Sequence, residues 1–425
     1  MASSSDTAKK KILVPLLYRA HLGRLRPVLR AIQNHPRLTL QVAVGTQAAY
    51  GSFFTNLRHA EPRSWRAGLP WYVRSRVSAL LPHFSLSRDS LSRKVAEAGF
   101  PIDASVPLFV EGGTPRTMAK SMGLGVIRFT DACLRLKPDM MLIHADRFEM
   151  MAIALAAVCL NIPIAHNEAG DVSGTIDESI RHAITKFAHM HFAATEESRR
   201  RVVQMGEDPG FAFTVGSPAI DALMEMDLRP QELIFKEIDP LRPYLLIVVH
   251  PVTTESREQN ETLLKSVLDA AAGLRMQAVF VGWNPDAHSR AFDPIVTAWM
   301  REVKPAGFHR IKWAHPDRYL RALAGAACVV GNSSSFIREA AYLGVPSVLV
   351  GSRQQGRERG ENAIEVAPDG AAIERAVRQQ IAHGAYPRDL RFGDGHAGEK
   401  IAEILARENP PIQKRFYDLK SGVTS

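Results

Sequence analysis

The chain has 425 residues, of which 46% are hydrophobic and 23% charged, and its formal net charge is +9. These proportions exclude a disordered chain, and no apolar run reaches the roughly 18 residues of a membrane span. The basic excess is mild, so it does not predict nucleic-acid binding. Three isolated cysteines, Cys133, Cys159 and Cys328, and an N-terminus without an apolar segment after its lysines predict a cytoplasmic protein without disulfides or signal peptide.

Short apolar runs alternate with amphipathic segments along most of the chain. The runs that predict strands are Ile12–Leu17, Leu38–Val44, Met140–His144, Pro163–Ala165, His191–Ala194, Tyr244–Val249, Ala278–Val281, Cys328–Val330 and Ser347–Val350. The segments that predict helices include Leu22–Ile32, Phe148–Leu160, Ile176–Ala188 and Ser333–Leu343. This alternation predicts the α/β class, with parallel sheets covered by helices on both faces. Pro15 lacks a backbone donor and is therefore expected at an edge or near a strand end.

A segment with three prolines, Met226–Pro243, is predicted to link two α/β halves. We expect a first domain over residues 1–230, a second over 231–408, and a tail over 409–425 that packs back on the first. Residues 51–100 hold eight Lys and Arg against three Asp and Glu, and are interpreted as an insertion in the first domain. Within it, Leu69–Phe84 fits a surface helix, a lid over an anionic ligand, or a membrane-contacting segment.

Polar residues follow several predicted strands of the second half. Ser333 and Ser334 come after a strand and open a predicted helix, a typical site for phosphate, although an ordinary helix cap fits equally well. Glu339 follows about one and a half turns later, where it could reach a ribose or simply face solvent. Arg353 lies in a strand-end loop suited to a diphosphate, and His250 also ends a strand. Each has an equally common structural role.

Carboxylates stand out in the first half. Asp146 and Glu168 each follow a predicted strand, and Asp177 opens a predicted helix. Carboxylates at neighbouring strand ends converge at one edge of a sheet, where their pKa values move apart and one site can hold an acid and a base. Singly, each fits a turn or a helix N-terminus. The sequence contains no GxGxxG after a strand, no GxxxxGK[ST], no HExxH and no GxSxG, so dinucleotide, P-loop, zincin and esterase chemistry have no support.

The run HNEAGDVSGTIDESIRHAITK, residues 166–186, resembles the active-site signature of hydrolysing UDP-N-acetylglucosamine 2-epimerases. Further similar motifs follow in order: HADRFEM at 144–150, VHPVTTES at 249–256, GNSSS at 331–335, GSRQQGRERGEN at 351–362, and more weakly GDGHA at 393–397 with QKRFYD at 413–418. Departures from the family pattern include His21, Ala145, Asp171 and Phe336, where Asp, Gly, Glu and Gly are usual.

The resemblance implies two Rossmann-like domains facing a cleft, as in GT-B glycosyltransferases. It implies release of a nucleoside diphosphate and a free manno-configured sugar, by elimination and then hydration, without cofactor or metal. It also implies a homodimer or homotetramer. The implied catalytic residues are Asp146, Glu168, Asp177 and His250, and the implied substrate-binding residues are Arg19, Arg147, Asn284, Ser333, Ser334, Glu339 and Arg353. A GT-B glycosyltransferase with a UDP-sugar donor is the alternative.

Overall fold

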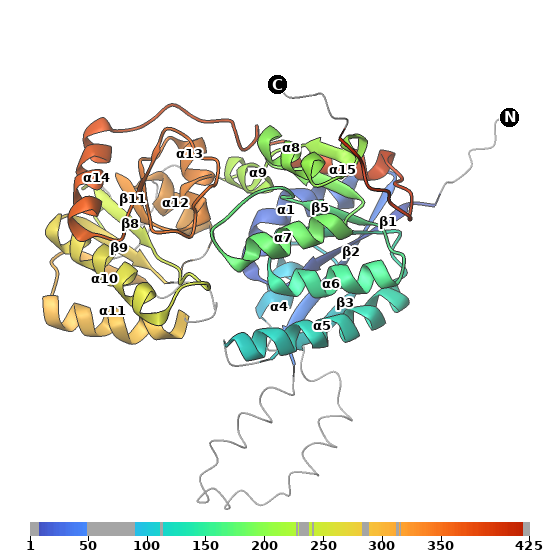
Figure 1. Ribbon diagram of the computed structural model, residues 1–425, viewed down its shortest axis with the longest axis horizontal. Helices are drawn as coiled ribbons and strands as arrows, with labels where there is room; N and C mark the ends of the chain where they lie inside the picture. Colours follow the sequence, from blue (N-terminus) through green and yellow to red (C-terminus); the bar gives the residue numbers. More distant parts are fainter. Residues whose placement is uncertain are drawn as a thin grey trace, which may run out of the picture.

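The computed structural model describes residues 8–48, 90–110, 114–226, 228, 238–239, 242–282, 289–311, 314 and 316–419. Asn284, the segment Leu69–Phe84 and most of the predicted linker Met226–Pro243 lie outside these residues. The described residues form two α/β domains, each built on a parallel sheet, which appear as two lobes in Figure 1.

The first sheet has seven strands in the order β3-β2-β1-β4-β5-β6-β7. The strands are β1 (Lys10–Leu16), β2 (Leu38–Gln47), β3 (Ala104–Phe109), β4 (Met140–His144), β5 (Ile164–Asn167), β6 (Met190–Ala193) and β7 (Ala212–Thr214). Every neighbouring pair is parallel. This is the order of a dinucleotide-binding α/β sheet, extended by one strand.

The second sheet has six parallel strands in the order β10-β9-β8-β11-β12-β13. The strands are β8 (Tyr244–Val248), β9 (Gln277–Val281), β10 (Phe308–Ile311), β11 (Cys328–Gly331), β12 (Ser347–Val350) and β13 (Ala363–Val366). In each sheet the direction in which strands are added reverses once, between β1 and β4 and between β8 and β11.

Helices cover both faces of each sheet (Figure 1). Along the first half they are α1 (Arg19–Asn34), α4 (Ser90–Glu97), α5 (Pro115–Leu136), α6 (Phe148–Cys159), α7 (Ile176–Phe187), α8 (Glu196–Gln204), the 3-10 turn η1 (Pro209–Phe211) and α9 (Pro218–Met224). Along the second they are α10 (Arg257–Gly273), α11 (Ser289–Val303), α12 (Pro316–Ala324), the 3-10 turn η2 (Ser334–Phe336), α13 (Glu339–Leu343), α14 (Gly370–His383) and α15 (Ala397–Arg407). Side-chain caps define several starts; Ser256, for example, forms a capping box with Gln259 at α10.

Interior strands are buried on both faces, which explains their continuous apolar runs. In β1, Ile12 and Val14 pack in a core with α1, whereas Leu13 packs in a second core with α5 and α6. Strand β8 alternates in the same way between two cores of the second domain. Helix α6 packs between α5 and α7, and its Leu155 remains 38% exposed.

The chain returns to the first domain before its end. Ile401 and Leu405 of α15 are fully buried in the core that contains α1, although the sequence analysis assigns residues up to 408 to the second domain. The tail then continues along the first domain: Lys414 Nζ donates to the carbonyl oxygens of Lys186 (2.8 Å) and Ala188 (2.7 Å). The amide of Tyr417 donates to Gly206 O (2.9 Å). No helix in the described part of the chain is long and apolar enough to cross a bilayer.

All nine predicted strands are confirmed to within three residues at each end. Pro15 lies next to the end of β1, beyond the residues that pair with β4, so its missing donor interrupts no ladder on that side. One predicted helix is wrong in part. Ser333–Leu343 is not a continuous helix, because the 3-10 turn η2 is followed by only five residues of α13. Four strands, β3, β7, β10 and β13, were not predicted.

Candidate active site

The predicted site residues that the structure describes lie at or beyond the C-terminal ends of strands from both sheets. Arg19 begins α1 after β1, Asp146 and Arg147 follow β4, and Glu168 follows β5. His250, Ser333 and Arg353 follow β8, β11 and β12. In open parallel sheets these carboxyl ends, near the point where the strand order reverses, are where ligands bind.

Glu168 is buried at this edge and bridges the two domains. Its Oε1 accepts hydrogen bonds from Ser217 Oγ (2.9 Å) and from Arg338 Nη1 of the second domain (2.6 Å). Burial alone would raise the pKa of Glu168, but the guanidinium groups of Arg338 and Arg24 hold it well below its usual range. Glu168 is therefore an ionised carboxylate in a largely dry environment. Its φ of +63° is unusual for a residue with a side chain and directs the chain out of β5.

Asp146 is held by an arginine of α7. Its carboxylate forms an ion pair with Arg181, a side chain only 2% exposed, whose Nη1 also donates to Asp171 O (2.8 Å). Asp177 lies one turn before Arg181 on α7, so the two side chains share a helix face. Arg181 therefore contacts Asp146 and lies one turn after Asp177 along α7. Ala145 has φ +61°, which explains why glycine suits this position in the related motif.

Neutral histidines support these strand ends. His166 Nε2 bonds with Ala145 O (2.8 Å), and Asn167 Nδ2 with His144 Nδ1 (2.9 Å). Burial lowers the pKa of His144 to about 4 and that of His166 to about 3. Both rings are therefore uncharged at neutral pH, and they add no positive charge beside the carboxylates. His21 packs edge-on against His144, with ring centroids 5.7 Å apart.

On the second domain, Asn332 joins two strand ends. Its side chain accepts from the amide of His250 (2.7 Å) and donates to His250 O (2.8 Å), which fixes the residues after β8 and β11 together. Ser334 Oγ lies 3.5 Å from Arg24 Nη2 and 3.5 Å from Arg338 Nη2. Because α13 has only five residues, the positive potential here comes from these guanidinium groups more than from a helix dipole.

Two side chains of this segment point inward. Glu339 is 4% exposed, and its Oε2 lies 3.9 Å from Arg338 Nε. Phe336 is fully buried in the core of the second domain, so a bulky side chain in place of glycine does not narrow the space beside Ser333.

Loops of the two domains meet beside Asp171. Gly174 N donates to Arg353 O (3.1 Å), and Arg357 forms an ion pair with Asp171. Arg353 Nη1 donates to Asn332 O (2.9 Å), which holds its side chain beside the GNSSS motif. Asp171 replaces the usual glutamate of the motif, and the shorter acid is used to join the domains.

Arg147 lies at the opposite side of the site, on the first domain. It is the N-cap residue just before α6, its Nη2 donates to Tyr18 OH (3.3 Å), and its guanidinium carbon lies 4.8 Å from the centre of the Tyr18 ring. Tyr18 OH also bonds with Glu149, which is 1% exposed. These contacts hold the Arg147 side chain in one orientation.

Three arginines of the site, Arg24, Arg181 and Arg338, were not predicted, whereas Arg357 belongs to the strand-end loop that was expected to suit a diphosphate. Arg338 stands in SSFIREAAYLG, a largely apolar stretch between two buried strands, and Arg181 lies in the middle of an amphipathic helix. A charged residue within such a stretch needs a buried partner, and that was the available signal. The partners lie more than 100 residues away or on another element, so the sequence did not identify them.

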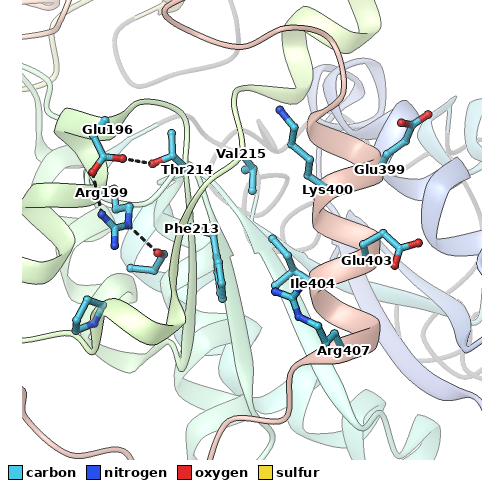
Figure 2. Close-up of a pocket in the computed structure, with 12 residues that line it drawn as sticks. Glu196, Arg199, Phe213, Thr214, Val215, Glu399, Lys400, Glu403, Ile404 and Arg407 are labelled. Carbon is cyan, nitrogen blue, oxygen red and sulfur yellow. Dashed lines mark hydrogen bonds and ion pairs between the residues drawn. The ribbon is translucent and has the colours of Figure 1, made fainter.

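A separate hollow of about 720 Å³ lies on the outer edge of the first domain, between β7 and α15 (Figure 2). None of the predicted site residues lines it. Some of the polar side chains that line it bond to one another: Glu196 accepts from Thr214 Oγ1 (2.7 Å) and Arg199 Nη1 (2.8 Å). Because it lacks the buried, oppositely charged groups found between the domains, we place the candidate active site at the domain boundary.

Replacing Gly174 by Ala should weaken the contact between the two domains. A Cβ at this position would lie 2.1 Å from Ser352 O, a backbone atom that cannot move alone. We expect a lower melting temperature, with a loss of about 1–3 kcal/mol, and faster hydrogen exchange over 170–175 and 351–357. Gly123→Ala is the matched control: nothing lies within 4 Å of its added Cβ on helix α5, so it should be neutral or stabilising. Equal melting temperatures for wild type and Gly174→Ala would contradict this contact.

Comparisons with known proteins agree on one family. A family model described as UDP-N-acetylglucosamine 2-epimerase matches residues 85–406. A protein of Legionella pneumophila named UDP-N,N'-diacetylbacillosamine 2-epimerase (hydrolyzing) is 33% identical over 308 residues, 72% of this chain and 81% of that protein. A protein of Neisseria meningitidis named UDP-N-acetylglucosamine 2-epimerase is 29% identical over 419 residues, 96% of this chain and 99% of that protein.

A solved structure has the same architecture. The crystal structure of UDP-GlcNAc 2-epimerase from Neisseria meningitidis bound to UDP-GlcNAc aligns with a TM-score of 0.73 and 19% identity, covering 94% of this chain and 100% of that chain. At this identity the likeness concerns the fold, and it confirms the predicted pair of Rossmann-like domains of the GT-B type.

Proposed function

The chain belongs to the UDP-N-acetylglucosamine 2-epimerase family, and we propose that it is a hydrolysing member. Its substrate would be a nucleoside diphosphate linked to an N-acetylglucosamine-type sugar. Its products would be the nucleoside diphosphate and the free manno epimer, N-acetylmannosamine or a diacetamido analogue. The observation that carries this proposal is the ionised, buried Glu168 at a strand end beside Asp146 and α7, facing the arginine- and serine-lined segment of the second domain.

The first half of the reaction requires a base near C2 of the sugar. Abstraction of the C2 proton, with loss of the diphosphate from C1, gives a 2-acetamidoglucal-like intermediate. A carboxylate that stays ionised at neutral pH can accept that proton, and Glu168 has this property. Water then adds at C1 and a proton returns to C2 from the opposite face, for which Asp146 and Asp177 are the candidates. His250 is a further candidate group at the end of β8.

The leaving diphosphate requires positive charge and hydrogen-bond donors. Arg24 and Arg338 flank Ser334, and Arg353 is held beside Asn332, so the proposed diphosphate position lies among fixed cations. Arg19, Arg147, Ser333 and Glu339 are the further substrate-binding candidates at the same strand ends. Preorganised charges of this kind stabilise the negative charge that develops on the leaving group.

One assay tests the proposed reaction. The protein is incubated with UDP-N-acetylglucosamine, its GDP analogue and a diacetamido-trideoxy analogue in deuterated water, and the mixture is followed by NMR. We expect a free 2-epimer carrying deuterium at C2, together with the nucleoside diphosphate. A 2-epimer that stays attached to its nucleotide would indicate a non-hydrolysing epimerase. Transfer only to an added acceptor would indicate a glycosyltransferase. Either result, or binding without turnover, would overturn the proposal.

A further inference from the structure

A buried ion pair joins the two domains. One of its members, Arg338, has so far been described only as a positive charge near the proposed diphosphate position. Arg338 Nη1 lies 2.6 Å from Glu168 Oε1, and the two side chains are 4% and 5% exposed. Arg338 precedes α13 in the second domain, whereas Glu168 follows β5 in the first. The pair is 170 residues apart in sequence, so it exists only when the two domains are in contact.

The same guanidinium reaches the opposite part of the site. Arg338 Nη2 lies 3.5 Å from Ser334 Oγ, and Arg338 Nε lies 3.9 Å from Glu339 Oε2. A planar guanidinium with several donors can hold two such groups at once, which a lysine ammonium does less well. Arg338 therefore links the carboxylate of the first domain to the serine segment of the second.

We propose that Arg338 is a positioning residue for this reaction: it holds the Glu168 carboxylate in its reactive orientation and charge state, and does so only while the domains are closed. This inference rests on the proposed function. Other groups face Glu168 as well, namely Arg24 and His21 from α1, His144 from β4 and His166 from β5. The histidines are buried and neutral, and Arg24 donates to Ser334, so among the described residues Arg338 is the cation in direct contact with Glu168.

Removing the charge should change how Glu168 titrates. Without Arg338, burial of the carboxylate would dominate and raise the pKa of Glu168. For Arg338→Gln we expect the acid limb of the pH profile of kcat/KM to move up by about one pH unit or more, with kcat reduced at pH 7. Arg338→Lys keeps the charge, so its acid limb should remain near that of the wild type. Arg388→Gln is the control, because Arg388 contacts Tyr342, one helical turn beyond Arg338, and not a carboxylate of the site; it should leave the profile unchanged.

A second readout does not depend on turnover. Protein labelled with ¹³C at glutamate side-chain carboxyls gives a Glu168 resonance, assigned by its loss in Glu168→Gln. In the wild type this resonance should titrate well below the range of a free glutamate, and in Arg338→Gln it should titrate above that range. Hydrogen exchange over 168–175 should also rise in Arg338→Gln, because the domains separate more easily.

The outcomes separate the two claims. A wild type that turns over no nucleotide sugar overturns the proposed function, and the carboxyl titration still decides the role of Arg338 in charging Glu168. An active wild type, with an Arg338→Gln variant whose acid limb and Glu168 titration are unchanged, overturns the positioning role. A uniform loss of kcat at every pH, with an unchanged Glu168 titration, would likewise reduce Arg338 to a structural or binding residue.

Discussion

Replacing Glu168 by Gln should lower kcat by about 10²–10⁴-fold, the usual contribution of a general acid or base. The amide keeps the size of the side chain and can still accept from Ser217 and Arg338, but it cannot take a proton from C2. The loss should therefore appear mainly in kcat, with nucleoside diphosphate binding retained. Steady-state rates and UDP titration calorimetry on the same preparation measure both quantities.

The control must remove another buried carboxylate without touching the site. Glu207 is 2% exposed and, like Glu168, contacts cationic side chains. It lies away from the site, where the C-terminal tail packs on the first domain. Glu207→Gln should lower stability and leave kcat unchanged when assayed well below its melting temperature. Asp146→Asn and Asp177→Asn should each fall in the same range as Glu168→Gln. Near-wild-type rates for two of these three variants would show that the site has been assigned to the wrong carboxylates.

The strands that the sequence did not predict share one property. β3 and β7 are the edges of the first sheet, and β10 and β13 are the edges of the second. Interior strands such as β4 and β8 are buried at every residue, whereas β10 and β13 are mostly half-buried. An edge strand packs less of its surface, so its sequence need not form a continuous apolar run. A continuous apolar run in the sequence therefore identifies the central strands of a parallel sheet more readily than its edge strands.

The site residues divide in a similar way into those that could be predicted from the sequence and those that could not. Residues directly after interior strands, such as Asp146 and Glu168, were predicted because position along a strand determines where a side chain emerges. The arginines that bind them come from helices and from the other domain, and pairing across 170 residues has no local signal. The helix Ser333–Leu343 failed for a related reason: tertiary packing of Phe336 and the buried Arg338 divides it into a 3-10 turn and a short helix.

Glu207 should be the residue through which the C-terminal tail stabilises the first domain. Its carboxylate binds His191 Nε2 (3.0 Å), Lys186 Nζ (2.6 Å) and Lys414 of the tail. Burial would raise the pKa of Glu207, but these three partners lower it to about 2. For Glu207→Gln we expect a loss of about 2–3 kcal/mol at pH 7, near the lower limit for breaking a buried pair, because Lys186 is 41% exposed and can be hydrated.

The pH dependence of this effect follows from the direction of the shift. The pKa of Glu207 is lower in the folded protein than the roughly 4.3 of an unfolded glutamate. Its stabilising effect is therefore fully present above about pH 4.3 and is lost as the pH falls toward the folded value. Denaturant unfolding of wild type and Glu207→Gln should differ at pH 7 and converge as the pH falls from about 4 toward 2. Lys414→Met should cost stability as well, and the double variant should lose less than the sum of the single losses, because both substitutions break the same contact. Strictly additive losses would mean that the tail is held by its backbone hydrogen bonds and not by this carboxylate.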